Sequence, residues 1–167
     1  MNELNKLLQH YKRKGLLIDT NIMLVLFVGR VNRQRISEFN RTEKYTAKDY
    51  DTLVKITKKF VKIVTTPNIL TEVNSLINQL KDPERSQCLK LFSQLLSRID
   101  EFYLESKQIS EMEKFAKFGL TDCGILDLAK DRYLVLTDDF KLANYLQSVG
   151  VDTINFANIQ QFYYFKP

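Results

Sequence analysis

The sequence predicts an α/β fold in which a parallel sheet lies between two layers of helices. Short apolar runs that suit buried strands alternate with longer stretches whose apolar side chains recur at helical spacing. Such long stretches are the crossovers that parallel strands require, whereas a tight turn joins only antiparallel strands. The chain has 167 residues and no linker rich in Gly, Pro or Ser, so one domain over residues 1–167 is expected.

The segments interpreted as strands are short, and turn residues bound several of them. Gly15 stops the helix before the first strand, and Gly150 ends the helix before the last one. The expected strands are residues 16–19, 62–65, 102–104, 133–137 and 151–156.

Helices are expected in most of the remaining chain. Thr46 can cap one helix while Asp49 favours its first turn, and Pro67 suits the start of the next. Thr121 is the expected cap of a helix that begins at Asp122. The expected helices are residues 1–14, 22–28, one from residue 46, one from residue 67, one after residue 83, and residues 111–118, 122–130 and 141–149.

Residues 29–45 break this alternation, because they are polar, rich in Arg and without an apolar period. They predict either a surface loop or an extension of the neighbouring helices. Arg30, Arg33 and Arg35 are candidates for nucleic-acid binding, since cations that neutralise phosphates release bound counterions. A solvated loop that lies far from any substrate carries equal weight.

Composition narrows the chemistry that the chain can perform. His10 is the only histidine, which excludes mechanisms that need two histidines and disfavours Ser-His-Asp and Cys-His hydrolases. Cys88 and Cys123 are isolated, and we expect them to be small buried apolar groups. Carboxylate chemistry remains, with 20 acidic residues available. The 25 Lys and Arg residues give a net charge of +5, which suits a polyanionic substrate.

Neither a membrane span nor an export signal is expected. The longest apolar run, residues 22–28, is far shorter than the roughly 20 residues that cross a bilayer. The first 15 residues form a polar amphipathic pattern without an apolar signal core. A cytoplasmic protein without a membrane partner is therefore expected.

Carboxylates follow the predicted strands at the edge where open parallel sheets bind ligands. Asp19 ends the first strand, and Asp138 and Asp139 follow the fourth. Glu72 lies in the first turns of the helix after the second strand, and Asp122 begins a later helix. Each acid alone has an ordinary explanation as a cap, a turn residue or a solvated helix residue. Together, at one edge, they predict a shared site.

Several carboxylates at one edge repel each other and raise each other's pKa unless a cation lies among them. Ligand sets made only of oxygen suit Mg²⁺ or Mn²⁺. Nucleases use such ions to activate water and to stabilise the charge that builds on phosphate. The expected metal ligands are Asp19, Glu72, Asp122, Asp139 and Asp138.

Four segments resemble the acidic motifs of PIN domains in residue type, order and rough spacing. They are Leu-Ile-Asp-Thr-Asn at 17–21, Thr-Pro-Asn-Ile-Leu-Thr-Glu-Val at 66–73, Thr-Asp-Cys-Gly-Ile at 121–125 and Leu-Val-Leu-Thr-Asp-Asp at 134–139, and the resemblance covers about residues 16–160. It implies a five-stranded parallel sheet of order 3-2-1-4-5 and Mg²⁺ or Mn²⁺ as cofactor. It also implies metal-dependent endonuclease activity, usually on RNA, with DNA left open.

The resemblance also implies a role for single residues. Asp138 occupies the variable position of the Thr-x-Asp motif, so its role stays undefined. By motif match, Asp19 is the central ligand, Glu72 and Asp122 are further ligands, Asp139 is the acid of the Thr-x-Asp motif, and Asn21 and Thr137 are supporting groups that orient ligands or water.

PIN domains include the toxins of toxin–antitoxin pairs as well as RNA-processing nucleases. The N-terminal helix and residues 29–45 depart from compact toxins. A toxin role, an inhibitory antitoxin-like partner and a homodimer therefore stay open.

Three other protein classes compete with the nuclease interpretation. The main alternative is an inactive relative that only binds RNA or protein, although all four acids are present. A receiver-type phosphoacceptor domain needs an Asp pair at the first strand and a Lys after the fifth, where Asn155 stands. A haloacid-dehalogenase-like phosphatase needs Asp-x-Asp at the first strand, but residue 21 is Asn.

Overall fold

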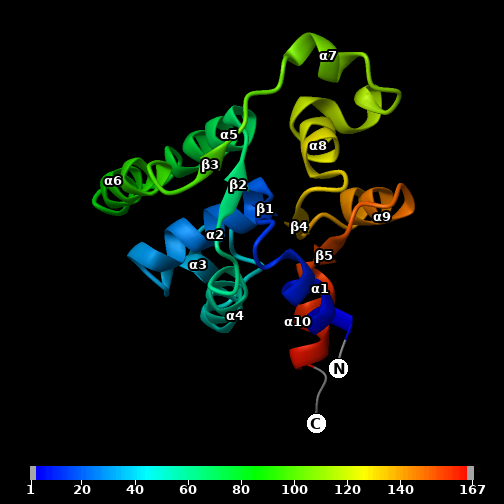
Figure 1. Ribbon diagram of the computed structural model, residues 1–167. Coiled ribbons are helices and arrows are strands. Elements are labelled where there is room, and N and C mark those ends of the chain that lie inside the picture. The colour runs from blue at the N-terminus through cyan, green and yellow to red at the C-terminus, as the bar shows by residue number, and fades with distance from the viewer. Residues whose placement is uncertain (1–2, 165–167) are drawn as a thin grey trace.

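Figure 1 presents the computed structural model, which describes the backbone of residues 3–164 and the side chains of residues 3–161. Residues 1–2 and 165–167, which belong to the expected N-terminal helix and the expected single domain, lie outside the described residues. The predicted α/β fold and the parallel strand order β3-β2-β1-β4-β5 are confirmed. The strands are β1 Leu16–Ile18, β2 Ile63–Thr65, β3 Asp100–Glu101, β4 Leu134–Thr137 and β5 Thr153–Asn155.

β1 lies in the middle of the sheet and is buried on both faces. Leu17 lies opposite Val64 of β2 and Val135 of β4 in the two parallel ladders, and all three residues are fully buried. Burial on both faces explains why these strands are continuous apolar runs rather than alternating ones. Because the strands are parallel, their carboxyl ends share one edge, and the residues that follow them can meet there.

Helices cover both sides of the sheet (Figure 1). One side holds α2 Thr20–Val31, α3 Arg35–Glu38, α4 Ala47–Thr57, α5 Pro67–Ile77 and α6 Glu84–Leu96. The other side holds α8 Phe115–Ala129 and α9 Phe140–Ser148, while α7 Ser106–Ser110 precedes α8, and α1 Glu3–Tyr11 and α10 Phe156–Tyr164 lie toward the two ends of the chain. Among the described residues, no helix has both the length and the apolar character needed to cross a bilayer.

α2 is the central helix of its layer, because α4, α5 and α6 all pack against it. The side chains of Ile22, Leu24, Val25 and Val28 are almost fully buried. A helix that is covered on several sides needs apolar side chains around its whole circumference. This arrangement explains why residues 22–28 lack a polar stripe.

The predicted helix starts at residues 46 and 67 are confirmed in detail. Thr46 and Asp49 form a capping box around the first turn of α4. Thr66 caps α5, and Pro67 occupies its first turn. α2 begins earlier than predicted, at Thr20, because the residue before it provides the cap.

The structure differs from the prediction after α6. β3 is Asp100–Glu101 rather than residues 102–104, and both of its residues are exposed at the edge of the sheet. A short exposed edge strand needs no apolar pattern, so the sequence carries no signal for it. The helix expected over 111–118 begins later than predicted, at Phe115, because residues 111–114 form turns and a bend; the expected break at Gly119 is confirmed, since the backbone leaves helical geometry there.

Residues 29–45 form a folded part of the domain rather than a solvated loop. α2 continues through Val31, so the expected extension of a neighbouring helix is confirmed, and α3 adds one short helix. Ile36, Phe39 and Tyr45 are buried in the core. These anchors lie in or next to turns, and the sequence therefore shows no regular apolar period here.

The N-terminal helix is shorter than the expected residues 1–14 and ends at Tyr11. The Tyr11 hydroxyl donates a hydrogen bond to the Asp152 carboxylate at 2.9 Å, which ties α1 to the loop before β5. Gly15 then takes a φ of 127°, a backbone conformation that disfavours side chains and turns the chain into β1.

Gly29→Ala is expected to destabilise the fold, although Ala is the better helix former. A Cβ at residue 29 would lie 2.4 Å from the Tyr50 ring and 2.8 Å from Ile36. Overpacking of this kind lowers the free energy of unfolding by about 1–3 kcal/mol, which denaturant titration measures.

Gly124→Ala in α8 is the matched control, because its Cβ would approach only Leu104, at 3.4 Å. Its free energy of unfolding should stay unchanged or rise by up to about 1 kcal/mol. An equally stable Gly29→Ala variant would contradict the close packing of α2 on α4.

Candidate functional site

A pocket of about 390 Å³ lies at the carboxyl edge of the sheet. Four of the predicted acids line it: Asp19, Glu72, Asp122 and Asp139. They come from four segments that are far apart in the sequence, and the parallel topology brings these segments to one edge. The other lining residues are Thr20, Asn21, Thr71, Ser75 and Leu76.

Asp19 lies at the centre of this pocket and is only 7% exposed. One of its carboxylate oxygens accepts a hydrogen bond from the Thr20 backbone N–H at 2.6 Å, which caps α2. The other oxygen accepts from the Thr137 hydroxyl at 2.6 Å. Thr137 is fully buried at the end of β4 and also accepts from the Asp139 backbone N–H, at 3.0 Å. The orientation of the Asp19 carboxylate is thus fixed by the start of α2 and by the end of β4.

Glu72 joins the two sides of the pocket. Its carboxylate accepts hydrogen bonds from the Thr20 hydroxyl of α2 at 2.9 Å and from the Thr121 hydroxyl of α8 at 2.5 Å. The sequence predicted Thr121 as a helix cap, but α8 starts earlier, and its break at Gly119 leaves this hydroxyl free to reach Glu72. No local sequence pattern predicts either threonine contact, because each joins segments that are far apart in the chain.

Asp139 and Asp122 complete the acidic lining. Asp139 caps α9 by accepting a hydrogen bond from the Leu142 backbone N–H at 2.8 Å. Within the described residues, no hydrogen-bond donor reaches the Asp122 carboxylate. Asp122 is therefore the acid of the pocket with the most unused capacity to accept a ligand.

Burial and mutual repulsion shift the ionisation of two of these acids. Burial, opposed in part by the hydrogen bonds from Thr137 and Thr20, raises the pKa of Asp19 from its ordinary value of 3.8 to about 6. Burial and then the charges of Asp19, Asp139 and Glu72 raise the pKa of Asp122 to about 7. Without a cation, the pocket therefore holds protons at a pH where ordinary carboxylates have lost theirs.

Asp138 does not line the pocket. Its side chain is 3% exposed and accepts hydrogen bonds from the Tyr45 hydroxyl and, at 3.2 Å, from the Asn21 amide. The Lys44 ammonium forms an ion pair with the same carboxylate. Asp138, which the sequence predicts as a metal ligand, therefore lies outside the pocket that the other four acids line, and its carboxylate contacts Lys44, Tyr45 and Asn21 instead.

Asn21 connects Asp138 to the pocket. It lines the pocket, and its side-chain amide donates a hydrogen bond to the Asp138 carboxylate. Burial and the charge of Asp138 raise the pKa of Tyr45 far above its usual range, so its hydroxyl stays protonated as a donor. Tyr45 and Lys44 were missed as neighbours of the site. Tyr45 lies 93 positions from Asp138, and no periodic pattern links the two.

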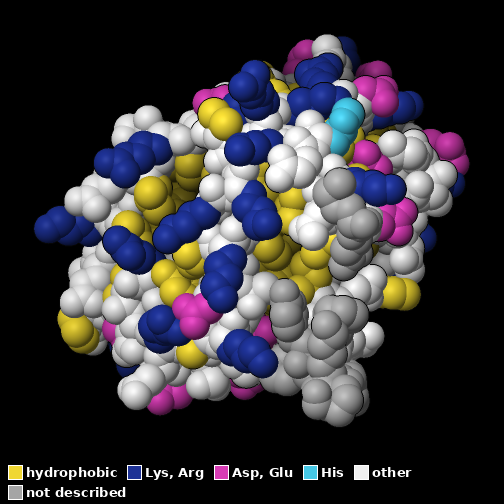
Figure 2. Space-filling view, turned by 60° about the horizontal axis from the view of Figure 1, so that its bottom comes forward, with side chains coloured by type: hydrophobic (Ala, Val, Ile, Leu, Met, Phe, Trp, Pro, Cys, Tyr) yellow, Lys and Arg dark blue, Asp and Glu magenta, His cyan; other side chains and the backbone are white. Residues whose placement is uncertain are grey.

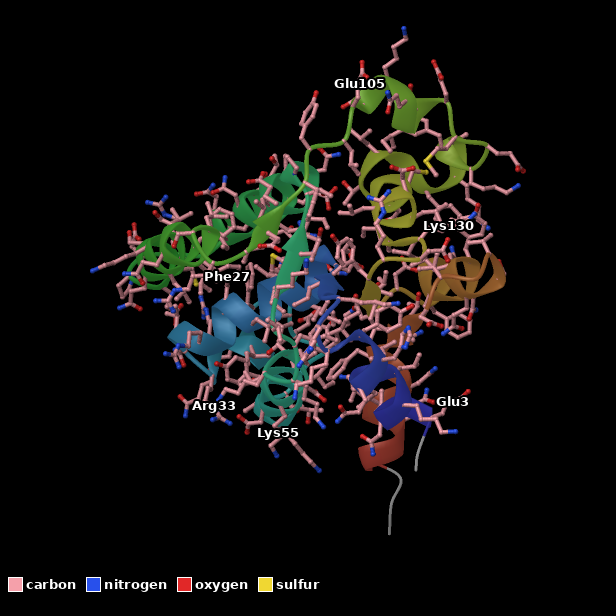
Figure 3. All side chains as sticks on the ribbon, viewed as in Figure 1. Glu3, Phe27, Arg33, Lys55, Glu105 and Lys130 are labelled. Atoms are coloured by element: carbon pink, nitrogen blue, oxygen red, sulfur yellow. The ribbon has the colours of Figure 1, made fainter. Side chains whose placement is uncertain are left out.

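The three arginines predicted to bind nucleic acid do not line the acidic pocket. Arg30 lines a separate cavity of about 810 Å³ between α2, α4 and α6. Arg33 forms an ion pair with Asp51, and Figure 3 shows it on the outer side of the layer that contains α3 and α4. Arg35 pairs with Glu84 at 2.9 Å. Two of the three are therefore already engaged with acidic side chains.

The donor chemistry of the pocket fits a divalent cation, although the acids do not form a closed ligand cage. Carboxylate oxygens are the preferred ligands of Mg²⁺ and Mn²⁺, and Asp122 has no competing partner within the described chain. In the described part of the chain, no three Asp, Glu, His or Cys side chains are gathered closely enough to hold a metal. Hydrogen bonds from threonines and backbone amides keep these like charges apart.

Comparison of the sequence with protein-family models gives no match, and comparison with curated proteins gives none either. Any assignment of function therefore depends on the chemistry of the pocket and on the fold.

Asp19→Asn is expected to stabilise the metal-free protein at high pH. Because the pKa of Asp19 is raised to about 6 in the fold, its ionisation costs the folded state free energy. Asp19 therefore does not lower the free energy of unfolding below about pH 4, and it lowers this free energy progressively as the pH rises from 4 through 6. At pH 8 in EDTA, Asn should raise the free energy of unfolding by roughly 1–3 kcal/mol, and Asn retains the helix cap.

Denaturant titration at pH 5 and at pH 8 measures this effect. Asp127→Asn, which changes an exposed acid on α8, is the control and should show no pH-dependent gain. If Asp19→Asn lowered the free energy of unfolding at both pH values, the ionised Asp19 carboxylate would not destabilise the folded state.

Asp138 and Asp139 are expected to respond differently to removal of their charge. Asp139→Asn keeps the cap of α9 and should leave stability within about 0.5 kcal/mol while weakening the binding of Mn²⁺. Asp138→Asn should cost about 1–3 kcal/mol, because it breaks the ion pair with Lys44 and weakens the bonds from Tyr45 and Asn21.

Denaturant titration and Mn²⁺ titration on both variants separate these effects. If Asp138→Asn bound Mn²⁺ more weakly than Asp139→Asn while remaining folded, Asp138 would be the ligand after all.

Proposed function

We propose that the chain is a metal-dependent nuclease of the PIN-domain type that cleaves RNA internally. One observation supports the proposal above all others. Four carboxylates from four separate segments share a pocket at the carboxyl edge of a parallel sheet, and no Lys or Arg side chain is among the residues that line it. A stabilising ion pair inside the protein would require such a cation, whereas a metal site requires that the acids stay free of one.

In this proposal, Asp19, Glu72, Asp122 and Asp139 hold Mg²⁺ or Mn²⁺. When bound, a divalent cation supplies the Lewis acidity that activates water and stabilises charge on a phosphodiester. All other contributions come from the residues of the chain.

The protein residues act by holding the acids in place before the substrate arrives. Thr137 and the Thr20 backbone amide orient the two oxygens of Asp19. The hydroxyls of Thr20 and Thr121 orient the two oxygens of Glu72. Such fixed geometry lowers the reorganisation that catalysis would otherwise require. Asp122 lacks this support in the described chain and is the acid that can adjust to a ligand.

The charge of the molecule suits an RNA substrate. The net charge is +5, even though the pocket is acidic, so the positive charge lies outside the pocket. Figure 2, in which the bottom of the Figure 1 view comes forward, shows Lys and Arg side chains spread over that face, where they outnumber the acidic ones; the acidic pocket lies at the opposite edge of the sheet. A basic exterior raises the local concentration of a polyanion, while a cation in the pocket can accept the phosphate itself. DNA carries the same phosphates and is the second candidate substrate.

Asp19→Asn is expected to reduce Mg²⁺-dependent or Mn²⁺-dependent cleavage at least about 100-fold, because it removes a charge from the centre of the ligand set. Purified protein is incubated with labelled RNA or DNA in the presence of Mg²⁺, Mn²⁺ or EDTA, and the products are separated by size. EDTA should abolish cleavage by the unchanged protein.

Asp127→Asn is the matched control, because Asp127 lies on the same helix as Asp122 but is exposed and outside the pocket. It should cleave at the unchanged rate. Retention of cleavage by Asp19→Asn, or cleavage that survives EDTA, would contradict the proposed mechanism.

A further inference from the structure

A second hollow, of about 500 Å³, adjoins the acidic pocket. The two share Thr71, Glu72 and Asp122, so a ligand that enters one extends directly into the other. The rest of its lining comes from Asn68 of α5 and from residues 118–121, where α8 is broken. Its size falls within the range of ordinary small-molecule sites, roughly 300–1,000 Å³.

The break in α8 creates this hollow. Gly119 has a φ of 74°, which interrupts the helix, and a Cβ at this position would meet nothing within 4 Å. The backbone at Gly119 therefore borders open space rather than packed side chains. In a continuous helix, residue 119 would have helical geometry, and the helix would not be interrupted where it lines the hollow.

The walls of the hollow combine apolar and polar groups in a specific way. Phe118 and Leu120 contribute an apolar wall, and Tyr145 stacks on the Phe118 ring with centroids 4.7 Å apart, which fixes that ring. The polar groups are Asn68, Thr71, Thr121 and the carboxylates of Glu72 and Asp122 that the hollow shares with the acidic pocket. Among residues 3–161, the Asn68 amide and the Thr71 hydroxyl have no hydrogen-bond partner. A flat ligand with hydrogen-bonding edges suits such walls.

We propose that this hollow is a subsite for an unpaired nucleobase next to the phosphate at the acidic pocket. Tyr145 covers one face of the Phe118 ring, so the rest of Phe118 together with Leu120 forms the apolar surface that can contact a base, and an Asn side chain can bond to the edge of a base. The Lys117 ammonium lies 4.9 Å from the centre of the Phe118 ring, where it can neutralise a flanking phosphate. The inference rests on the proposed nuclease function, because that function places the phosphate in the adjoining pocket.

The subsite selects for unpaired nucleic acid. A base inside a duplex is stacked on its neighbours and paired along its edge, so it cannot contact both Phe118 and Asn68 without leaving the helix. Double-stranded nucleic acid should therefore bind mainly through its phosphates, and more weakly than a single strand.

Binding is measured in the full-length Asp19→Asn background, which prevents cleavage. The probes are a fluorescent single-stranded oligoribonucleotide, the same strand in a duplex, and a ribose-phosphate strand of equal length without bases. The single strand should bind about ten-fold more tightly than the strand without bases, since stacking of a base on an aromatic side chain contributes an effect of this size.

Phe118→Leu should remove most of that difference while leaving the affinity for the strand without bases unchanged. Tyr103→Leu is the matched control, because Tyr103 is 79% exposed and lines neither hollow.

Because Phe118→Leu can weaken the packing on Tyr145, Asn68→Ala provides a second variant on a surface helix position. Because the Asn68 amide can bond to the edge of a base, the protein with Asn68 should bind homopolymers of A, C and U with different affinities. Asn68→Ala should reduce these differences without changing the melting temperature of the protein.

Each result separates the subsite from the nuclease. Metal-dependent cleavage together with equal binding of all three probes would overturn the subsite and leave the proposed function intact. Tight, base-dependent binding that Phe118→Leu abolishes would support the subsite even if the unchanged protein cleaved nothing. If neither the single strand nor the strand without bases bound to the unchanged protein, both the subsite and the nuclease function would be wrong.

Discussion

The repulsion of four carboxylates at the end of one sheet is the constraint on which the rest of this structure depends. The fold must hold Asp19, Glu72, Asp122 and Asp139 around one pocket without a basic side chain among them. Burial of the central strands supplies the rigid frame, and hydrogen bonds from threonines and helix starts hold three of the acids. Burial, with a smaller contribution from the neighbouring acidic charges, raises the pKa values of Asp19 and Asp122.

The position of β1 in the strand order makes this convergence unavoidable. β1 pairs with both β2 and β4, so the residue that follows it lies between the residues that follow its two neighbours. Asp19 directly follows β1, Asp139 is the second residue after β4, and Glu72 lies on α5, the helix after β2. A chain with β1 at the edge of the sheet would leave one side of Asp19 without a partner strand.

The parts of the fold that the sequence predicted are those encoded by local patterns. Strands buried on both faces are apolar runs, and carboxylates directly after them can be recognised without a structure. β3 escaped prediction because an exposed edge strand has no such pattern. The anchoring of Asp138 escaped for another reason: its partner Tyr45 lies 93 positions away, and adjacent acids in a turn look equivalent until the backbone aims one inward and the other toward the pocket. The contacts of Glu72 with Thr20 and Thr121 depend on three helices that meet only in the folded chain.

The wide spacing of the four acids along the chain has a consequence for the protein during its own synthesis. A ribosome that has made the first hundred residues has synthesised Asp19 and Glu72 but neither Asp122 nor Asp139. β4, which pairs with β1 and carries Thr137, is also still missing at that stage. A nascent or truncated chain therefore lacks half of the acidic pocket, and the complete constellation arises only when the last third of the polypeptide docks onto β1. If the proposed nuclease function holds, messenger RNA beside the translating ribosome is exposed to the full set of acids only after translation of the domain is almost finished.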